Sequence, residues 1–161
     1  NVYLLTVKIN NGAANEQDYI DTYNRLQNQR FDVQASKAIE LLVEIVREKN
    51  VHKDMENTLT FLKKLDKLVN KNVFYAYWRV SPYLQAQIYL QLGQPVDAFQ
   101  CYQESLRRFN RVESGLKMVA ELASQGYSEE AKLMLDQVVK LKDANSIKYK
   151  DDIENLYQHI Q

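Results

Sequence analysis

Apolar residues recur at helical spacing along most of this chain. Between residues 32 and 49, Ala38, Leu41, Leu42 and Ile45 follow the i, i+3, i+4, i+7 pattern of one buried helix face. Four glycines and two prolines supply too little turn chemistry for an all-β fold, so the pattern predicts an all-α protein. We expect seven to eight helices, at about 16–29, 32–49, 54–70, 82–93, 95–109, 112–125, 128–141 and 146–160.

Two segments depart from this regular pattern. Residues 2–9 alternate weakly and end at a strong turn signal, Asn10-Asn11-Gly12, so residues 1–15 are predicted to form an extended arm or a short strand. The remaining residues, 16–161, are expected to form a single helical domain. Residues 73–80 contain four aromatics within five positions. They lie between two predicted helices, since Ser81-Pro82 has the form of a helix start. This run is either a core plug or an exposed aromatic surface, and the core is favoured.

A 33-residue echo runs through the second half of the chain. Residues 118–131 match residues 85–98 in side-chain size and polarity. A fixed period of this length indicates stacked supersecondary units, in which small side chains allow close helix contacts. The echo pairs Gly93 with Gly126, Ala98 with Ala131, Tyr89 with Leu122, and Tyr102 with Leu135.

These residues resemble tetratricopeptide repeats, most clearly over residues 82–110 and 115–143. The family's early tryptophan falls here on Pro82 and Gly115, which is a departure from its pattern. The resemblance implies a right-handed stack of antiparallel helix hairpins, a TPR-like α-solenoid. It also implies capping helices at residues 16–29 and 146–160.

Composition narrows the possible partners. The 21 basic and 21 acidic residues leave no net field, which argues against a nucleic acid or an anionic membrane as the partner. No stretch reaches the roughly 20 apolar residues that span a bilayer, so direct membrane insertion by this segment is not expected. The start at Asn1 favours a fragment or a processed protein, whose full-length form could be membrane-anchored. One cysteine indicates no compartment, so cytoplasmic and extracytoplasmic locations both remain open.

The sequence contains no recognisable catalytic constellation. His52 and His159 are expected to be solvated surface residues, and Cys101 is expected to be a buried, inert thiol. The acidic group at residues 151–154 is interpreted as an exposed helix face, and no phosphate loop or nucleophile motif is present. We therefore expect a protein that is not an enzyme, without catalytic residues, cofactor or metal.

The leading hypothesis is a non-catalytic interaction or scaffold module that binds a protein or peptide in a TPR-like groove. Two alternatives stay open: a soluble extramembrane repeat domain of a larger bacterial membrane enzyme, such as a glycan (O-antigen type) polymerase or ligase, and a regulatory repeat domain of a transcription factor. The resemblance places the groove at Tyr83, Gln87, Leu90, Leu116 and Lys117. The rival surface, suggested by the residue types enriched at binding hot spots, is Tyr77, Trp78 and Arg79.

Overall fold

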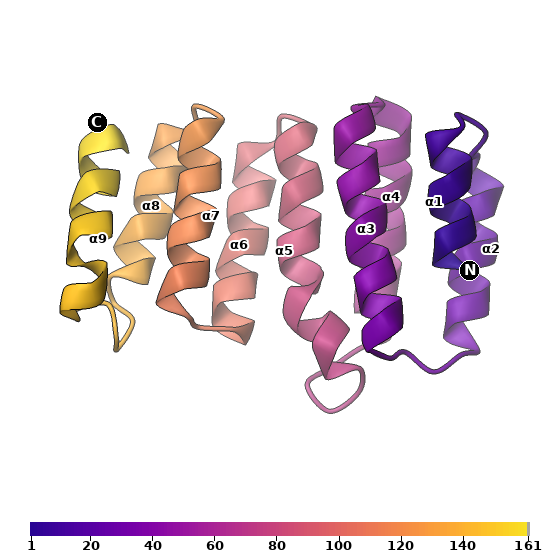
Figure 1. The fold of residues 1–161 in the computed structure, drawn as a ribbon, viewed down its shortest axis with the longest axis horizontal. Helices are drawn as coiled ribbons and strands as arrows, with labels where there is room; N and C mark the ends of the chain where they lie inside the picture. Colours follow the sequence, from indigo (N-terminus) through magenta and orange to yellow (C-terminus); the bar gives the residue numbers. More distant parts are fainter. Residues whose placement is uncertain (161) are drawn as a thin grey trace. The chain divides into compact units, whose positions relative to one another are not determined.

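The computed structural model describes residues 1–160, and this part of the chain consists of helices joined by short turns (Figure 1). The all-α prediction is confirmed. Nine helices are present in the described residues, one more than the eight expected ranges, with an isolated bridge between Asn70 and Val73 but no strand. They are α1 (Val2–Asn10), α2 (Glu16–Gln27), α3 (Val33–Lys49), α4 (His52–Asp66), α5 (Tyr75–Gln91), α6 (Pro95–Arg108), α7 (Val112–Ser124), α8 (Ser128–Val138) and α9 (Ile147–Ile160).

The additional helix is α1, so the prediction of an extended arm or strand at residues 1–15 is wrong. Asn1 caps the helix, because its side chain accepts a hydrogen bond of 2.8 Å from the amide of Leu4. The buried residues of α1 are Val2, Leu5, Thr6 and Ile9, which have the i, i+3, i+4, i+7 spacing of a helix. The apparent alternation arose because the opposite side of this helix is also apolar.

The second departure is the start of α5, which begins at Tyr75 rather than at Pro82. Pro82 therefore lies inside the helix, where proline has no N–H to donate to the carbonyl one turn earlier. The ribbon of α5 bends in its first half (Figure 1). The aromatic run is thus helical, and helical geometry sends its side chains to different sides.

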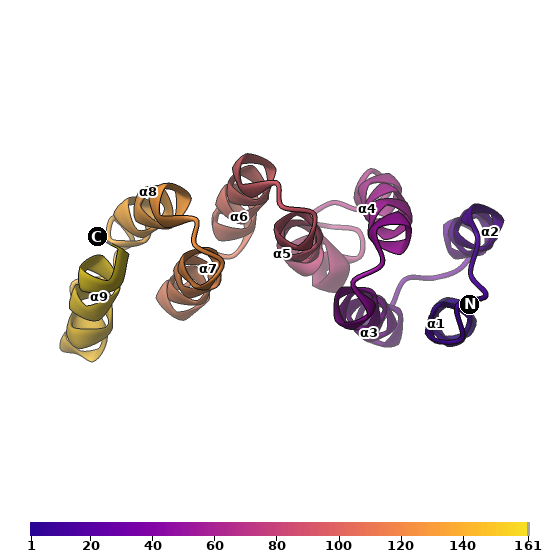
Figure 2. The same ribbon diagram turned by 90° about the horizontal axis from the view of Figure 1, so that it is seen from above.

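The chain divides into two compact units, Asn1–Gly93 and the described residues from Gln94 onward. In the first unit α1 packs on α3 and α3 on α5 in one layer, while α2 packs on α4 in the other (Figure 2). In the second unit α6 packs on α8 and α7 on α9, and the α7–α8 pairing is the most extensive contact between helices. The sequence predicts that residues 16–161 form one domain. In the structure, the contacts among the described residues cluster into these two units.

Each unit has its own apolar core. In the first unit the fully buried side chains include Ile39, Leu42, Leu62 and Leu65, together with Tyr77, whose hydroxyl donates to the carbonyl of Leu62 at 3.3 Å. In the second unit the corresponding residues are Met118, Leu122, Met134, Leu135 and Tyr102. Each core is formed by the apolar stripes of short helices, because a helix of this length is not stable without tertiary packing.

Left-handed residues follow every second helix of the chain up to α7. Gly12 follows α1, Asn50 ends α3, Gly93 follows α5 and Gly126 follows α7, and each has a φ between 51° and 83°. A left-handed residue at this position turns the chain after a helix and satisfies its last carbonyls. The first half therefore shares the turn geometry of the 33-residue echo, although its sequence does not show the echo.

Gly115 marks the tightest helix contact that the structure gives for a glycine. A Cβ at this position would lie 2.5 Å from Cγ2 and 3.2 Å from Cγ1 of Val138, and 3.4 Å from Cδ1 of Leu106. The glycine thus allows α7 to approach α8 and α6 more closely than any larger residue would.

We predict that Gly115→Ala destabilises the protein by about 1–2 kcal/mol in urea unfolding. Alanine favours a helix over glycine by about 1 kcal/mol, but the clash with Val138 exceeds this gain. Val138→Ala provides the control, because it removes both methyl groups that the new Cβ would meet. In that background the clash is absent, so Gly115→Ala should be neutral or stabilise the protein by up to about 1 kcal/mol, the helix preference of alanine over glycine. Equal costs in both backgrounds would show that the contact does not limit the packing.

Candidate functional site

The structure separates the residues that the sequence selected as a binding groove. Gln87 and Leu90 are buried, with 3% and 6% of their surface exposed, so the expectation that they face a partner is wrong. Tyr83 on the same helix is half-buried. Leu116 is largely buried and Lys117 is exposed, and both line an open groove. Of these five positions, Leu116 and Lys117 are the two that line this groove.

This groove lies between α7 and α9 and has a volume of about 460 Å³. Leu116 and Lys117 form its α7 side. The α9 side consists of Asp152, Asn155, Leu156 and His159, which have the i, i+3, i+4, i+7 spacing of one helix face. The groove is therefore lined by two leucines and by four polar side chains, which are a lysine, an aspartate, an asparagine and a histidine. We refer to these six residues as the α7–α9 groove.

His159 has a defined orientation in this groove. Its Nδ1 lies 2.8 Å from the backbone carbonyl oxygen of Asn155, one turn earlier in α9. A carbonyl only accepts, so Nδ1 carries a proton and Nε2 of the neutral ring is an acceptor. The sequence predicts His159 on the surface, and its side chain is exposed. The helical spacing of His159 from Asp152 and Leu156 was the signal that could have placed it on the same face of α9 as the groove.

The N-terminal ends of α7 and α9 are joined by a cluster of Glu113, Lys148 and Tyr149. The hydroxyl of Tyr149 donates to Oε1 of Glu113, and Nζ of Lys148 lies 3.0 Å from the same oxygen. The hydrogen bond from Tyr149, followed by that from Lys148, lowers the pKa of Glu113 to about 2. Through this cluster Tyr149, which is buried, holds the start of α9 against the start of α7.

A second tyrosine attaches α9 to α8. The hydroxyl of Tyr157 donates to Oδ1 of Asp136 at 2.8 Å. Burial, and then the adjacent carboxylate of Asp136, raise the pKa of Tyr157 to about 12. The two tyrosines lie two turns apart on α9, so they fix the height and the rotation of the helix that forms one wall of the groove.

The aromatic run does not form a single core plug or a single surface. Tyr77 is completely buried, and its ring centroid lies 5.7 Å from that of Phe31. Tyr75 is 48% exposed and Trp78 is half-buried, with 5.8 Å between their ring centroids. Arg79 is half-buried. Tyr77 therefore has a structural role, and only the outer side of the run can meet a partner.

A smaller cleft of about 80 Å³ lies between α2 and α4 in the first unit. Tyr19, Phe61 and Tyr23 contribute to its walls, and Nζ of Lys64 lies 5.8 Å from the ring centroid of Tyr23. The hydroxyl of Thr58 donates to that of Tyr19 at 3.2 Å, which stabilises the cleft floor. This space is much smaller than the α7–α9 groove and suits at most one small side chain.

The remaining candidate residues lie apart from the groove. His52 is exposed at the start of α4, with Nδ1 3.5 Å from Oε1 of Glu56. Cys101 is half-buried rather than buried, because it lies at the edge of the apolar stripe of α6. Among residues 1–160, no three His, Cys, Asp or Glu side chains are grouped so that they could hold a metal ion. None of the described helices combines the length and apolarity needed to cross a membrane.

Comparison with known proteins adds no relative: no protein-family model matches the chain, and neither a curated protein nor a solved structure is significantly similar to it.

We predict that the Glu113 cluster contributes pH-dependent stability between about pH 4.5 and pH 2. The pKa of Glu113 is lowered in the folded protein, so its contribution is present above the ordinary glutamate value of 4.5 and is lost as the pH falls toward 2. Urea unfolding should show that Glu113→Gln is less stable than the parent at pH 7, and that this difference shrinks as the pH approaches 2.

Glu129→Gln is the matched control, since Glu129 is an exposed acid in the first turn of α8 in the same unit. It shares the helix-dipole effect of Glu113 but not the tyrosine hydrogen bond. A Glu113→Gln deficit that stays constant between pH 7 and pH 2 would contradict the assignment.

Proposed function

We propose that this chain is a non-catalytic interaction module that binds a protein or peptide segment in the α7–α9 groove. The observation that carries the proposal is the groove itself, where Leu116 and Lys117, selected from the repeat pattern, face one continuous side of α9. Its volume of about 460 Å³ lies within the range of about 300–1,000 Å³ typical of ligand sites.

The proposal includes a TPR-like repeat architecture. Its support is the recurrence of left-handed turns after α1, α3, α5 and α7 and the burial of residues that the 33-residue echo makes equivalent. Ala98 and Ala131 are both completely inaccessible, as are Tyr102 and Leu135. A right-handed stack of helix hairpins would account for these shared features.

The chemistry of the groove favours a particular kind of peptide. Leu116 and Leu156 form an apolar strip, while Lys117 offers a positive charge near it, and Asp152 and Nε2 of His159 add acceptors. A short peptide with one aliphatic side chain and adjacent polar groups would use all of these. The groove is open rather than enclosed, so we expect dissociation constants near the micromolar range, about −8 kcal/mol.

The test is selection of binders from a random displayed peptide library against the complete chain. Peptides selected on the parent should bind the double variant Lys117→Glu/His159→Ala at least about tenfold more weakly in calorimetry, because the variant alters both sides of the groove. Helicity should be unchanged, since Lys117 and His159 are exposed.

Lys132→Glu is the matched control, because it reverses an exposed lysine of α8 in the same unit, outside the groove. It should bind the selected peptides like the parent. Failure to enrich any peptide, or equal binding by the groove variant and the control, would refute the proposed function.

A further inference from the structure

Helix α1 is apolar on two opposite sides, and residues 1–160 cover only one of them. Its buried stripe, Val2, Leu5, Thr6 and Ile9, faces the rest of the first unit, where α1 packs on α3 and α2. Tyr3, Leu4 and Val7 lie on the other side and are 53%, 51% and 53% exposed. We call these three residues the outer stripe of α1. A helix that is apolar all round is normally covered on all sides.

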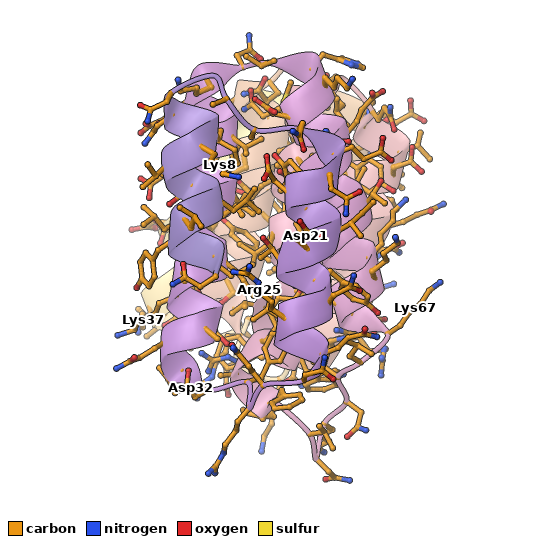
Figure 3. All side chains as sticks on the ribbon, turned by 90° about the vertical axis from the view of Figure 1, so that its right-hand side faces the viewer. Lys8, Asp21, Arg25, Asp32, Lys37 and Lys67 are labelled. Atoms are coloured by element: carbon orange, nitrogen blue, oxygen red, sulfur yellow. The ribbon has the colours of Figure 1, made fainter. Side chains whose placement is uncertain are left out.

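Charged side chains lie beside the outer stripe. Figure 3 shows Lys8 and Arg25 extending into the space between α1 and α2, with Asp21 on the α2 side. Leu4, Lys8, Asp21 and Arg25 line the same shallow cleft of about 60 Å³. Lys8 is already paired with Asp18, whereas Asp21 accepts only a neutral hydrogen bond, 2.8 Å from Nε2 of Gln17.

Asp21 and Arg25 have opposite charges one helical turn apart on α2, and both are exposed. Neither forms a salt bridge with another of residues 1–160. Such a pair is self-complementary. If two copies of α2 lie antiparallel about a two-fold axis that crosses them midway between these residues, Asp21 of each copy meets Arg25 of the other.

We propose that the face formed by α1 and α2 is a self-association surface, on which two copies of this chain pair about a two-fold axis perpendicular to these helices. The same axis places the outer stripe of α1 against its symmetry mate, so that Tyr3, Leu4 and Val7 are removed from water. The zero net charge of the chain offers no long-range repulsion to this pairing. The surface lies in the first unit, and its use does not depend on the α7–α9 groove.

Charge exchange between the copies tests the proposal. Asp21→Arg places two positive charges on α2 and Arg25→Asp places two negative charges there, so each variant should repel itself. In sedimentation equilibrium the parent should dimerise, and each single variant should dimerise at least about tenfold more weakly. An equimolar mixture of the two variants should regain association, because each α2 then meets a partner of opposite charge.

The apolar part is tested with Leu4→Glu, which should also weaken the dimer without loss of helicity because Leu4 is half exposed. Leu133→Glu is the control, since it places the same charge at a 46% exposed leucine of α8. Parent protein that remains monomeric up to about 1 mM would overturn the proposal. So would a mixture of Asp21→Arg and Arg25→Asp that associates no better than either variant alone.

Discussion

Close packing between short helices is the constraint on which the rest of this structure depends. The described helices have between 9 and 17 residues, a range in which helical stability comes mainly from tertiary packing rather than from the isolated helix. Each must bury an apolar stripe against its neighbours. Small side chains at the contacts, Gly115 against Val138 most tightly, set how closely the helices approach.

The α7–α9 groove is a consequence of the same packing. Helix α9 contacts both α7 and α8, and it carries only two buried residues, Tyr149 and Ile160. Its position therefore depends strongly on polar anchors, the hydroxyls of Tyr149 and Tyr157 on the carboxylates of Glu113 and Asp136. These anchors lie outside the groove, so they hold its α9 wall in place without occupying it.

The α7–α9 groove and the outer stripe of α1 share one physical feature. Exposed apolar surface that is surrounded by polar groups is typical of an interaction site. The groove and the outer stripe of α1 both have this form, but the groove contains cationic and anionic side chains, whereas the outer stripe lies beside a self-complementary charge pair. The first is our proposed site for a short peptide segment, and the second is our proposed self-association surface.

The hydrophobic pattern by itself determined the helical class and most helix positions. A helix that buries one face has apolar residues at regular spacing along its own sequence, so the pattern can be recognised without knowledge of its neighbours. The same local logic identified Gly93 and Gly126 as turns. It failed at α1, where apolar residues on both sides hid the helical period, and at Pro82, whose place within α5 is tolerated by the bend of that helix.

Only the tertiary structure decided which stripes face each other. Gln87 and Leu90 are buried although their register in the repeat predicted exposure, since the burial of a side chain depends on neighbouring elements as well as on its own helix. For the same reason His159, distant in sequence from Leu116, became part of the candidate site. The sequence predicts which face of a helix is apolar, but the tertiary contacts determine which other helix packs against that face.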